Sequence, residues 1–216
     1  MTTLTAIIPT VATDLARLTL LRRSMLSALH QLMPGDELIV AADTTDGPLD
    51  DVRELCGRLG AEAPEGACVR YVPHAGAAHT YGHDQVNAAM AAARGEYLVF
   101  SDDDDVWAAG AFQAIRDAAD ELSSPKPLLF RFRSYHGPTF WLAPGLLGKS
   151  LIGGHCIVAP NLPSLLGHWG APEGYDGPLP YYEGDWTFIE TTLALWAKVG
   201  VQPVWVDRLI AIARPT

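Results

Sequence analysis

Short apolar runs alternate with longer amphipathic segments through the first half of the chain. The apolar runs have the branched and aromatic composition of buried strands and cover residues 4–10, 38–41, 68–72 and 97–100. The segments between them repeat apolar residues at helical spacing and cover residues 14–32, 49–59 and 82–94. This order predicts an α/β fold with a mostly parallel central sheet and right-handed crossovers.

The first predicted helix shows the helical repeat most clearly. Thr13 or Asp14 is expected to cap it, because both side chains can accept a hydrogen bond from a free backbone N–H. Its apolar residues recur every three or four positions and should face the core: Leu15, Leu18, Leu21, Met25, Leu29 and Leu32.

The pattern becomes mixed in the second half of the chain. Helices are predicted at 109–122 and 185–198, and the glycine-rich residues 145–154 are predicted to be a flexible loop. Strands are predicted at 128–135, 139–142, 155–159, 204–206 and 209–213. We therefore predict one domain over residues 1–216. A nucleotide-type half at 1–107 is followed by a mixed half at 108–216, which completes the sheet and holds a second ligand.

Four consecutive aspartates, Asp102 to Asp105, directly follow the apolar run Tyr97–Phe100. Ligands of open α/β sheets bind beyond the carboxyl ends of the strands, where these side chains should lie. Adjacent carboxylates raise one another's proton affinity unless a cation neutralises them, and Mg²⁺, Mn²⁺ and Ca²⁺ prefer oxygen ligands. We predict a metal ion that bridges to a phosphate-bearing ligand. The alternative is a solvated acidic turn.

Composition narrows the classes of function. The 216 residues carry a formal net charge of −10, which argues against a broad nucleic-acid-binding surface. The three scattered cysteines form no close-spaced metal motif and suggest a reduced, cytoplasmic setting. The N-terminus lacks the features of a signal peptide, and no apolar run is long enough to span a bilayer.

Five motifs occur in an order that resembles the GT-A glycosyltransferases of family 2. They are Ile7-Ile8-Pro9-Thr10, the segment from Leu38 to Asp46, Asn87 placed eight residues before Gly95, Phe100-Ser101-Asp102-Asp103-Asp104-Asp105, and Tyr182-Glu183-Gly184-Asp185-Trp186. The resemblance implies a GT-A fold with a mostly parallel central sheet. Two positions depart from the family pattern: Val86 replaces the arginine before the helix asparagine, and Gly184 splits the late acidic pair.

The resemblance also implies roles for the acidic residues of the first half. Asp102 and Asp104 match the Asp-x-Asp pair that holds Mn²⁺ or Mg²⁺, with Asp104 as the direct ligand, and Asp103 supports the ribose or the second shell. Asp43 binds the nucleotide base or ribose, or else caps the turn through Gly47.

Further candidates come from the same motifs and from residue type. Pro9, Asn87 and His83 are predicted to contact the nucleotide, with His74 and His79 as further donors to its diphosphate, and His155 to approach the metal or the acceptor. Asp105 is interpreted as a cap for the helix near Ala109. Aromatic side chains that could stack on a sugar are Trp141, Trp169 and Trp186.

The predicted reaction moves a sugar from a nucleotide-diphosphate sugar, with a UDP-sugar favoured, to a saccharide or other hydroxyl acceptor. Asp185 is the first candidate for the general base and Glu183 the second, although an acidic residue at a helix start can also serve only as a cap. One base region and no nucleophile motif imply a single displacement with inversion. Two alternatives stay open: a haloacid dehalogenase-type phosphatase, and a catalytically idle sugar- or Ca²⁺-binding module.

Overall fold

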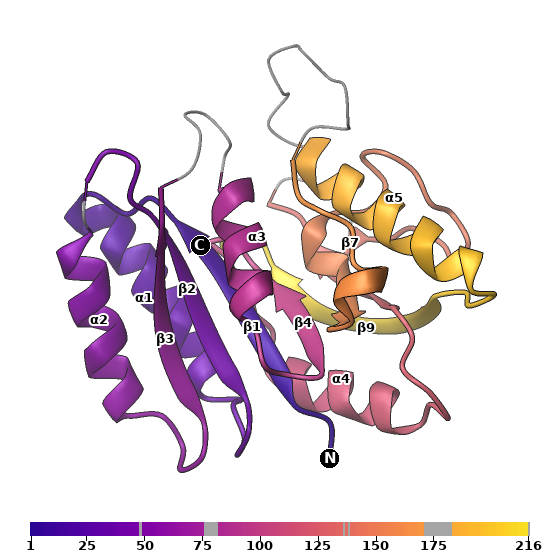
Figure 1. The fold of residues 1–216 in the computed structure, drawn as a ribbon, viewed down its shortest axis with the longest axis horizontal. Helices are drawn as coiled ribbons and strands as arrows, with labels where there is room; N and C mark the ends of the chain where they lie inside the picture. Colours follow the sequence, from indigo (N-terminus) through magenta and orange to yellow (C-terminus); the bar gives the residue numbers. More distant parts are fainter. Residues whose placement is uncertain (48, 76–81, 136, 138, 171–182, 216) are drawn as a thin grey trace.

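A nine-stranded mixed sheet forms the centre of the protein (Figure 1). The computed structural model describes residues 1–47, 49–75, 82–135, 137, 139–170 and 183–215. The strand order is β3-β2-β1-β4-β8-β6-β9-β5, and β7 pairs with β6 off this path. This arrangement confirms the predicted α/β class.

The first half is parallel, as its strand and helix alternation predicts. Its strands are β1 (Leu4–Thr10), β2 (Glu37–Asp43), β3 (Cys68–His74) and β4 (Tyr97–Phe100). The connecting helices are α1 (Leu15–Leu29), α2 (Asp50–Ala61) and α3 (His83–Ala92). Neighbouring strands pair in parallel from β3 through β2 and β1 to β4.

The second half adds strands of both directions. Its strands are β5 (Val106–Trp107), β6 (Leu128–Arg133), β7 (Thr139–Phe140), β8 (Ile157–Pro160) and β9 (Val204–Ile212). Its helices are α4 (Ala111–Asp120), α5 (Glu183–Lys198) and two 3₁₀ turns, Gly154–Cys156 and Pro163–Leu165. Strand β8 runs antiparallel to β4 and so joins the two halves into one sheet.

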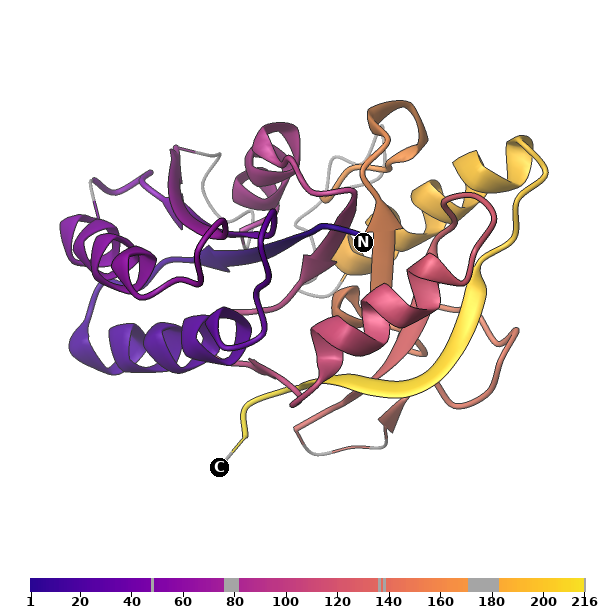
Figure 2. The ribbon, with the colours of Figure 1, turned by 90° about the horizontal axis from the view of Figure 1, so that it is seen from below.

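Both faces of the sheet are covered, because successive side chains of a strand point to opposite faces. On β2, Leu38 and Val40 pack in one apolar cluster with residues of α1, α2 and α4, whereas Ile39 and Ala41 pack in a second cluster with residues of α3 and α5. Figure 2 shows α1 and α4 on one side of the sheet and α3 and α5 on the other. Uninterrupted apolar runs are what a strand buried on both faces requires.

Several details differ from the sequence prediction. Asp14 caps α1 as expected, but Leu15 is 81% exposed rather than part of the core, because residues 13–16 lie outside the packed layer. The two strands predicted at 204–206 and 209–213 are one strand, β9, whose register against β6 shifts where the charged Asp207 and Arg208 interrupt the apolar pattern. The short strand β5 was not predicted, since two residues carry no periodicity.

None of the helices in the described part of the chain combines the length and apolar character that a membrane span requires.

Gly95 lies where the turn into β4 touches the backbone of β1. A Cβ at this position would lie 2.5 Å from the carbonyl carbon of Leu4 and 2.6 Å from the nitrogen of Thr5. The Gly95 N–H also donates to the Thr5 hydroxyl at 2.9 Å. Backbone atoms cannot move aside as a flexible side chain can, so the site admits only glycine.

We therefore expect Gly95→Ala to lower the free energy of unfolding by about 1–3 kcal/mol, the usual cost of overpacking. Gly57→Ala is the matched control, because Gly57 lies inside α2 with open space around the position of a Cβ. There alanine should raise stability by roughly 0.5–1 kcal/mol through its better helix propensity. Urea unfolding of both variants measures the difference, and equal midpoints would contradict the close contact at Gly95.

Candidate active site

A pocket lies at the carboxyl ends of β1 and β4, and α3, α5 and the segment before β8 close it. Its lining residues are Pro9, His83, Val86, Phe100, Ser101, Asp102, Gly154, His155, Trp169 and Asp185. The fold thus brings together six residues that the sequence named as candidates: Pro9, His83, Asp102, His155, Trp169 and Asp185. It places them where open α/β sheets bind ligands.

Two of the four consecutive aspartates are neutralised by arginines. Asp103 is buried and accepts from the Thr10 hydroxyl at 2.7 Å, and Arg17 lies 3.0 Å from its other oxygen. Asp104 lies 3.0 Å from Nε of Arg214 and 3.7 Å from Arg17. The carboxylate predicted to be the direct metal ligand, that of Asp104, is therefore held by two guanidinium groups.

Asp105 is buried and ion-paired, and it does not cap a helix. One carboxylate oxygen lies 2.7 Å from Nε2 of His155, and the other accepts from the backbone N–H of Arg214 at 2.7 Å. The predicted capping role is wrong because α4 begins later, at Ala111, after Gly110 in a left-handed conformation. Burial raises the pKa of Asp105, but the hydrogen bond and charge of His155, together with those of Arg214, outweigh this and leave the pKa below its usual value.

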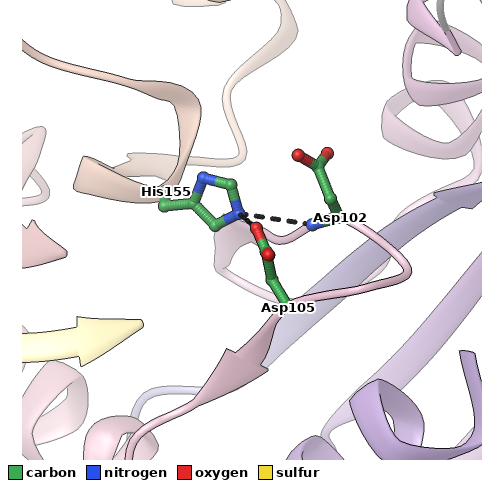
Figure 3. Close-up of side chains that lie close together, drawn as sticks. All are labelled: Asp102, Asp105 and His155. Atoms are coloured by element: carbon green, nitrogen blue, oxygen red, sulfur yellow. Dashed lines mark hydrogen bonds and ion pairs between the residues drawn. The ribbon is translucent and has the colours of Figure 1, made fainter. Parts of the chain in front are cut away.

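His155 is buried against the acidic loop (Figure 3). Burial alone would lower its pKa, but the hydrogen bond to Asp105 and the charges of Asp102 and Asp105 raise it to about 9. Nε2 also lies 3.3 Å from the amide nitrogen of Asp102. A protonated Nε2 donates to Asp105 and cannot also accept from that amide, so the shorter contact is the stronger interaction.

Asp102 differs from the other three aspartates. Desolvation, with the charges of Asp105 and Asp185, raises its pKa to about 7 against the opposing charge of His155, although the residue is exposed as a whole. Among the described residues, none hydrogen-bonds its carboxylate, which points away from Asp105 in Figure 3. Asp102 thus carries the carboxylate of the loop that is open to a ligand.

Asp102, Asp105 and His155 can form a metal site. One ligand atom from each lies within 4.8 Å of the others. Carboxylate ligands suit Mn²⁺ and Mg²⁺. An imidazole binds a metal only through a deprotonated nitrogen, so metal binding here would replace the bond between His155 and Asp105. The sequence named Asp102 as a metal ligand and His155 as a residue near the metal or the acceptor. It did not indicate that His155 pairs with Asp105, because 50 residues separate them along the chain.

Asp185 lies in the first turn of α5 and faces the pocket. Its Oδ2 accepts from the backbone N–H of Gly154 at 2.9 Å, so this carboxylate oxygen bonds to another segment of the chain. Gly184 packs directly against the His83 ring, and a Cβ at Gly184 would overlap that ring. The close packing explains why glycine splits the late acidic pair. The Glu183 side chain and all of His79 lie outside the described residues.

His83 begins α3 and is buried in the pocket wall. Burial lowers its pKa, while the negative charges of Asp185 and Asp84 oppose the shift. The imidazole is therefore biased toward its neutral form. His74, also predicted to face the diphosphate, ends β3 and does not line this pocket.

The amide of Asn87 is directed at Trp169. Its Nδ2 donates to the Trp169 carbonyl at 2.8 Å, and its Oδ1 accepts from the Trp169 N–H at 3.0 Å. Of the tryptophans predicted to stack on a sugar, Trp169 lines the pocket. Trp141 is buried in the core and donates to the Leu129 carbonyl, and Trp186 packs partly buried against the same apolar cluster.

A second cavity lies beside the carboxyl ends of β1 and β2. It is lined by Val11, Ala12, Thr13, Asp43, Asp46, Gly47, Leu49, Asp50 and Asp51. The Asp43 carboxylate accepts from both the N–H and the hydroxyl of Thr45, at 2.9 and 2.6 Å, so it stabilises the turn toward Gly47. The structural role predicted for Asp43 is present, and the residue also lines this second cavity.

Comparison with solved structures shows that the chain has the GT-A fold. TarS residues 1–349 from S. aureus superpose with a TM-score of 0.67 at 14% identity, over 98% of this chain and 60% of that one. The same fragment was solved in complex with UDP-GlcNAc. The mannosyltransferase PcManGT from Pyrobaculum calidifontis, in complex with GDP-Man and Mn²⁺, gives 0.60 at 17% identity, over 99% and 57%.

The family follows from the sequence itself. The family model described as glycosyl transferase family 2 matches residues 5–132, more than half of the chain, which therefore belongs to that family. This membership confirms the predicted resemblance and the glycosyltransferase class. No curated protein matches the chain. The chain spans about 60% of the length of the TarS fragment, so the likeness to TarS concerns the fold.

The arrangement of the acidic loop predicts which aspartate matters for metal binding. Asp102→Asn should weaken Mn²⁺ binding at least about tenfold, because replacing even a residue that only hydrogen-bonds to a metal ligand usually lowers metal affinity by that factor. Asp104→Asn should have the smaller effect, because Arg214 and Arg17 hold its carboxylate. Calorimetric titration with MnCl₂ measures both, and Asp51→Asn on the exposed start of α2 is the control. A larger loss in Asp104→Asn would identify Asp104 as the principal ligand, as the sequence predicts.

Proposed function

We propose that the protein is a divalent-cation-dependent, inverting glycosyltransferase. Its donor is a nucleotide-diphosphate sugar, with a UDP-sugar favoured, and its acceptor is a saccharide or another hydroxyl compound. One observation carries the proposal: Asp102 and His155, two members of the group that could hold a metal ion with Asp105, line the same pocket as a separate carboxylate, Asp185. A metal–diphosphate group and a proton acceptor are the two requirements of this reaction.

The proposed metal ligands are Asp102, Asp105 and His155. When bound, the cation would neutralise the diphosphate as it leaves. Two further aspartates have proposed roles outside the metal site. Asp43 faces the second cavity, beside β1, and is proposed to hold the base or ribose. Asp103 is held by Thr10 and Arg17, and it supports the shape of the loop from which Asp102 projects.

Asp185 is proposed as the general base that accepts the proton of the acceptor hydroxyl. The Gly154 N–H holds one of its oxygens and so orients the other. The apolar side chains of Phe100, Val86 and Trp169 line the same pocket and would exclude water from the reacting atoms. One base and direct attack on the anomeric carbon give inversion of configuration. Glu183 remains the second candidate.

The reaction class can be tested with three kinds of compound: nucleoside diphosphates, nucleotide sugars and a generic phosphate ester. A thermal-shift screen of nucleoside diphosphates with and without Mn²⁺ should show stabilisation that needs the metal. Slow hydrolysis of nucleotide sugars, with no hydrolysis of a generic phosphate ester, would then support a glycosyltransferase. Ester hydrolysis would instead favour the phosphatase, which the fold and family disfavour. Nucleotide-sugar binding without turnover would favour an idle binding module.

Asp185→Asn tests the base. Asparagine keeps a side-chain oxygen for the Gly154 N–H but cannot accept a proton at neutral pH, so transfer should slow by roughly 10²–10⁴-fold with donor affinity retained. Glu183→Gln is the paired variant and should leave turnover close to that of the unmodified protein. A severe loss in Glu183→Gln alone would move the base to Glu183. Full activity in both variants would refute a base in this segment.

Asp43→Ala should weaken donor binding more than it slows the bound complex, because Asp43 lies at the second cavity and not at the pocket of Asp102 and Asp185. Thr45→Ala is the control: it removes one of the two bonds that fix the turn but keeps the Asp43 carboxylate. Steady-state kinetics on both variants should show a raised KM for Asp43→Ala and a smaller change for Thr45→Ala. Equal effects would indicate that Asp43 acts only through the turn.

A further inference from the structure

Two buried polar groups, carried by residues that line the pocket, have no hydrogen-bond partner among the described residues. They are the hydroxyl of Ser101, at the end of β4, and the indole N–H of Trp169. The two residues are 2% and 6% exposed. A buried donor without an acceptor lowers stability, and such groups in folded proteins call for an explanation. A ligand that supplies the missing partners is one such explanation.

Several contacts fix the position of the Trp169 indole. Its ring stacks on Phe188 with centroids 4.9 Å apart and an interplanar angle of 16°, and it lies 5.2 Å from the Phe100 ring. Its backbone is fixed by the two hydrogen bonds of Asn87. Gly154 lacks the Cβ that would come within 2.5 Å of the indole. Side chains from several elements thus hold this ring in one orientation.

We infer that Ser101 and Trp169 hydrogen-bond hydroxyl groups of the sugar that is transferred, and that Asn87 is a positioning residue for Trp169. The inference rests on the proposed function. The sugar must lie between the diphosphate, which Asp102 would hold through the metal, and the acceptor, which Asp185 would activate. Ser101 and Trp169 line the pocket that both carboxylates share. A sugar offers hydroxyl oxygens for these groups and an apolar ring face for Phe100 and Val86.

Calorimetry with Mn²⁺ tests the inference with two pairs of probes, UDP-GlcNAc with UDP and GDP-mannose with GDP. The pair that the unmodified protein binds is used. Ser101→Ala and Trp169→Phe should each weaken binding of the nucleotide sugar by about 3- to 10-fold, the usual worth of one hydrogen bond. Binding of the matching diphosphate should not change, because the diphosphate lacks the sugar.

Trp196→Phe is the matched control. Trp196 is also buried with an indole N–H that has no partner among the described residues, but it does not line the pocket. This variant should bind both probes as the unmodified protein does. Ser101→Ala should also unfold at the same or a higher temperature, because it removes a buried group without breaking a bond. Lower affinity with undiminished stability marks a ligand-binding group rather than a structural one.

Asn87→Ala tests the positioning role by a double-mutant cycle. It should weaken nucleotide-sugar binding by itself but add little in the Trp169→Phe background, where the N–H is already absent. Additive losses would show that Asn87 acts independently of Trp169. Unchanged sugar affinity in both Ser101→Ala and Trp169→Phe, or equal loss for sugar and diphosphate, would overturn the inference while leaving the proposed function. Failure of the unmodified protein to bind any probe would overturn both.

Discussion

The neutralisation of four adjacent carboxylates is the interaction on which the site depends. Their mutual repulsion would open the loop after β4 unless cations from elsewhere in the fold met them. Arg17 comes from α1, Arg214 from the segment after β9 and His155 from the segment before β8, and each lies within 3.0 Å of one of the aspartates. Because these contacts join distant parts of the chain, the acidic loop connects the parallel half of the sheet to the mixed half.

The same arrangement leaves one carboxylate of the loop without an ion-pair or hydrogen-bond partner among the described residues. Three aspartates have cationic partners inside the protein, which leaves Asp102 directed at the pocket. Such asymmetry among identical neighbouring residues comes from their surroundings, since burial raises the pKa of a carboxyl group and a neighbouring cation lowers it. For Asp102 desolvation raises the pKa to about 7, whereas for Asp105 the contact with His155 lowers it.

The departures from the family pattern belong to one region. Val86 lines the pocket and Gly184 packs against the His83 ring, so both positions lie between α3 and α5. A longer side chain at Gly184 would displace His83 from the pocket wall. The pocket wall therefore has the apolar side chain of Val86 where the family pattern has an arginine. Beside Gly184, where the family pattern has an acidic residue, the wall is formed by the His83 imidazole. Asn87, kept from that pattern, orients Trp169 in the same wall.

The sequence by itself determined the α/β class, the parallel strands of the first half, the apolar faces of most helices and the edge of the sheet at which acidic residues gather. These features follow from local periodicity, because each strand or helix must bury the face that its own residues define. The tertiary structure alone decided the partners. In the folded chain Asp105 pairs with His155 instead of capping a helix, and the two strands predicted at 204–206 and 209–213 form the single strand β9. His155 and Arg214 both lie against the acidic loop. Such contacts link positions 50 or more residues apart, and no local pattern of residues encodes which distant segments will meet.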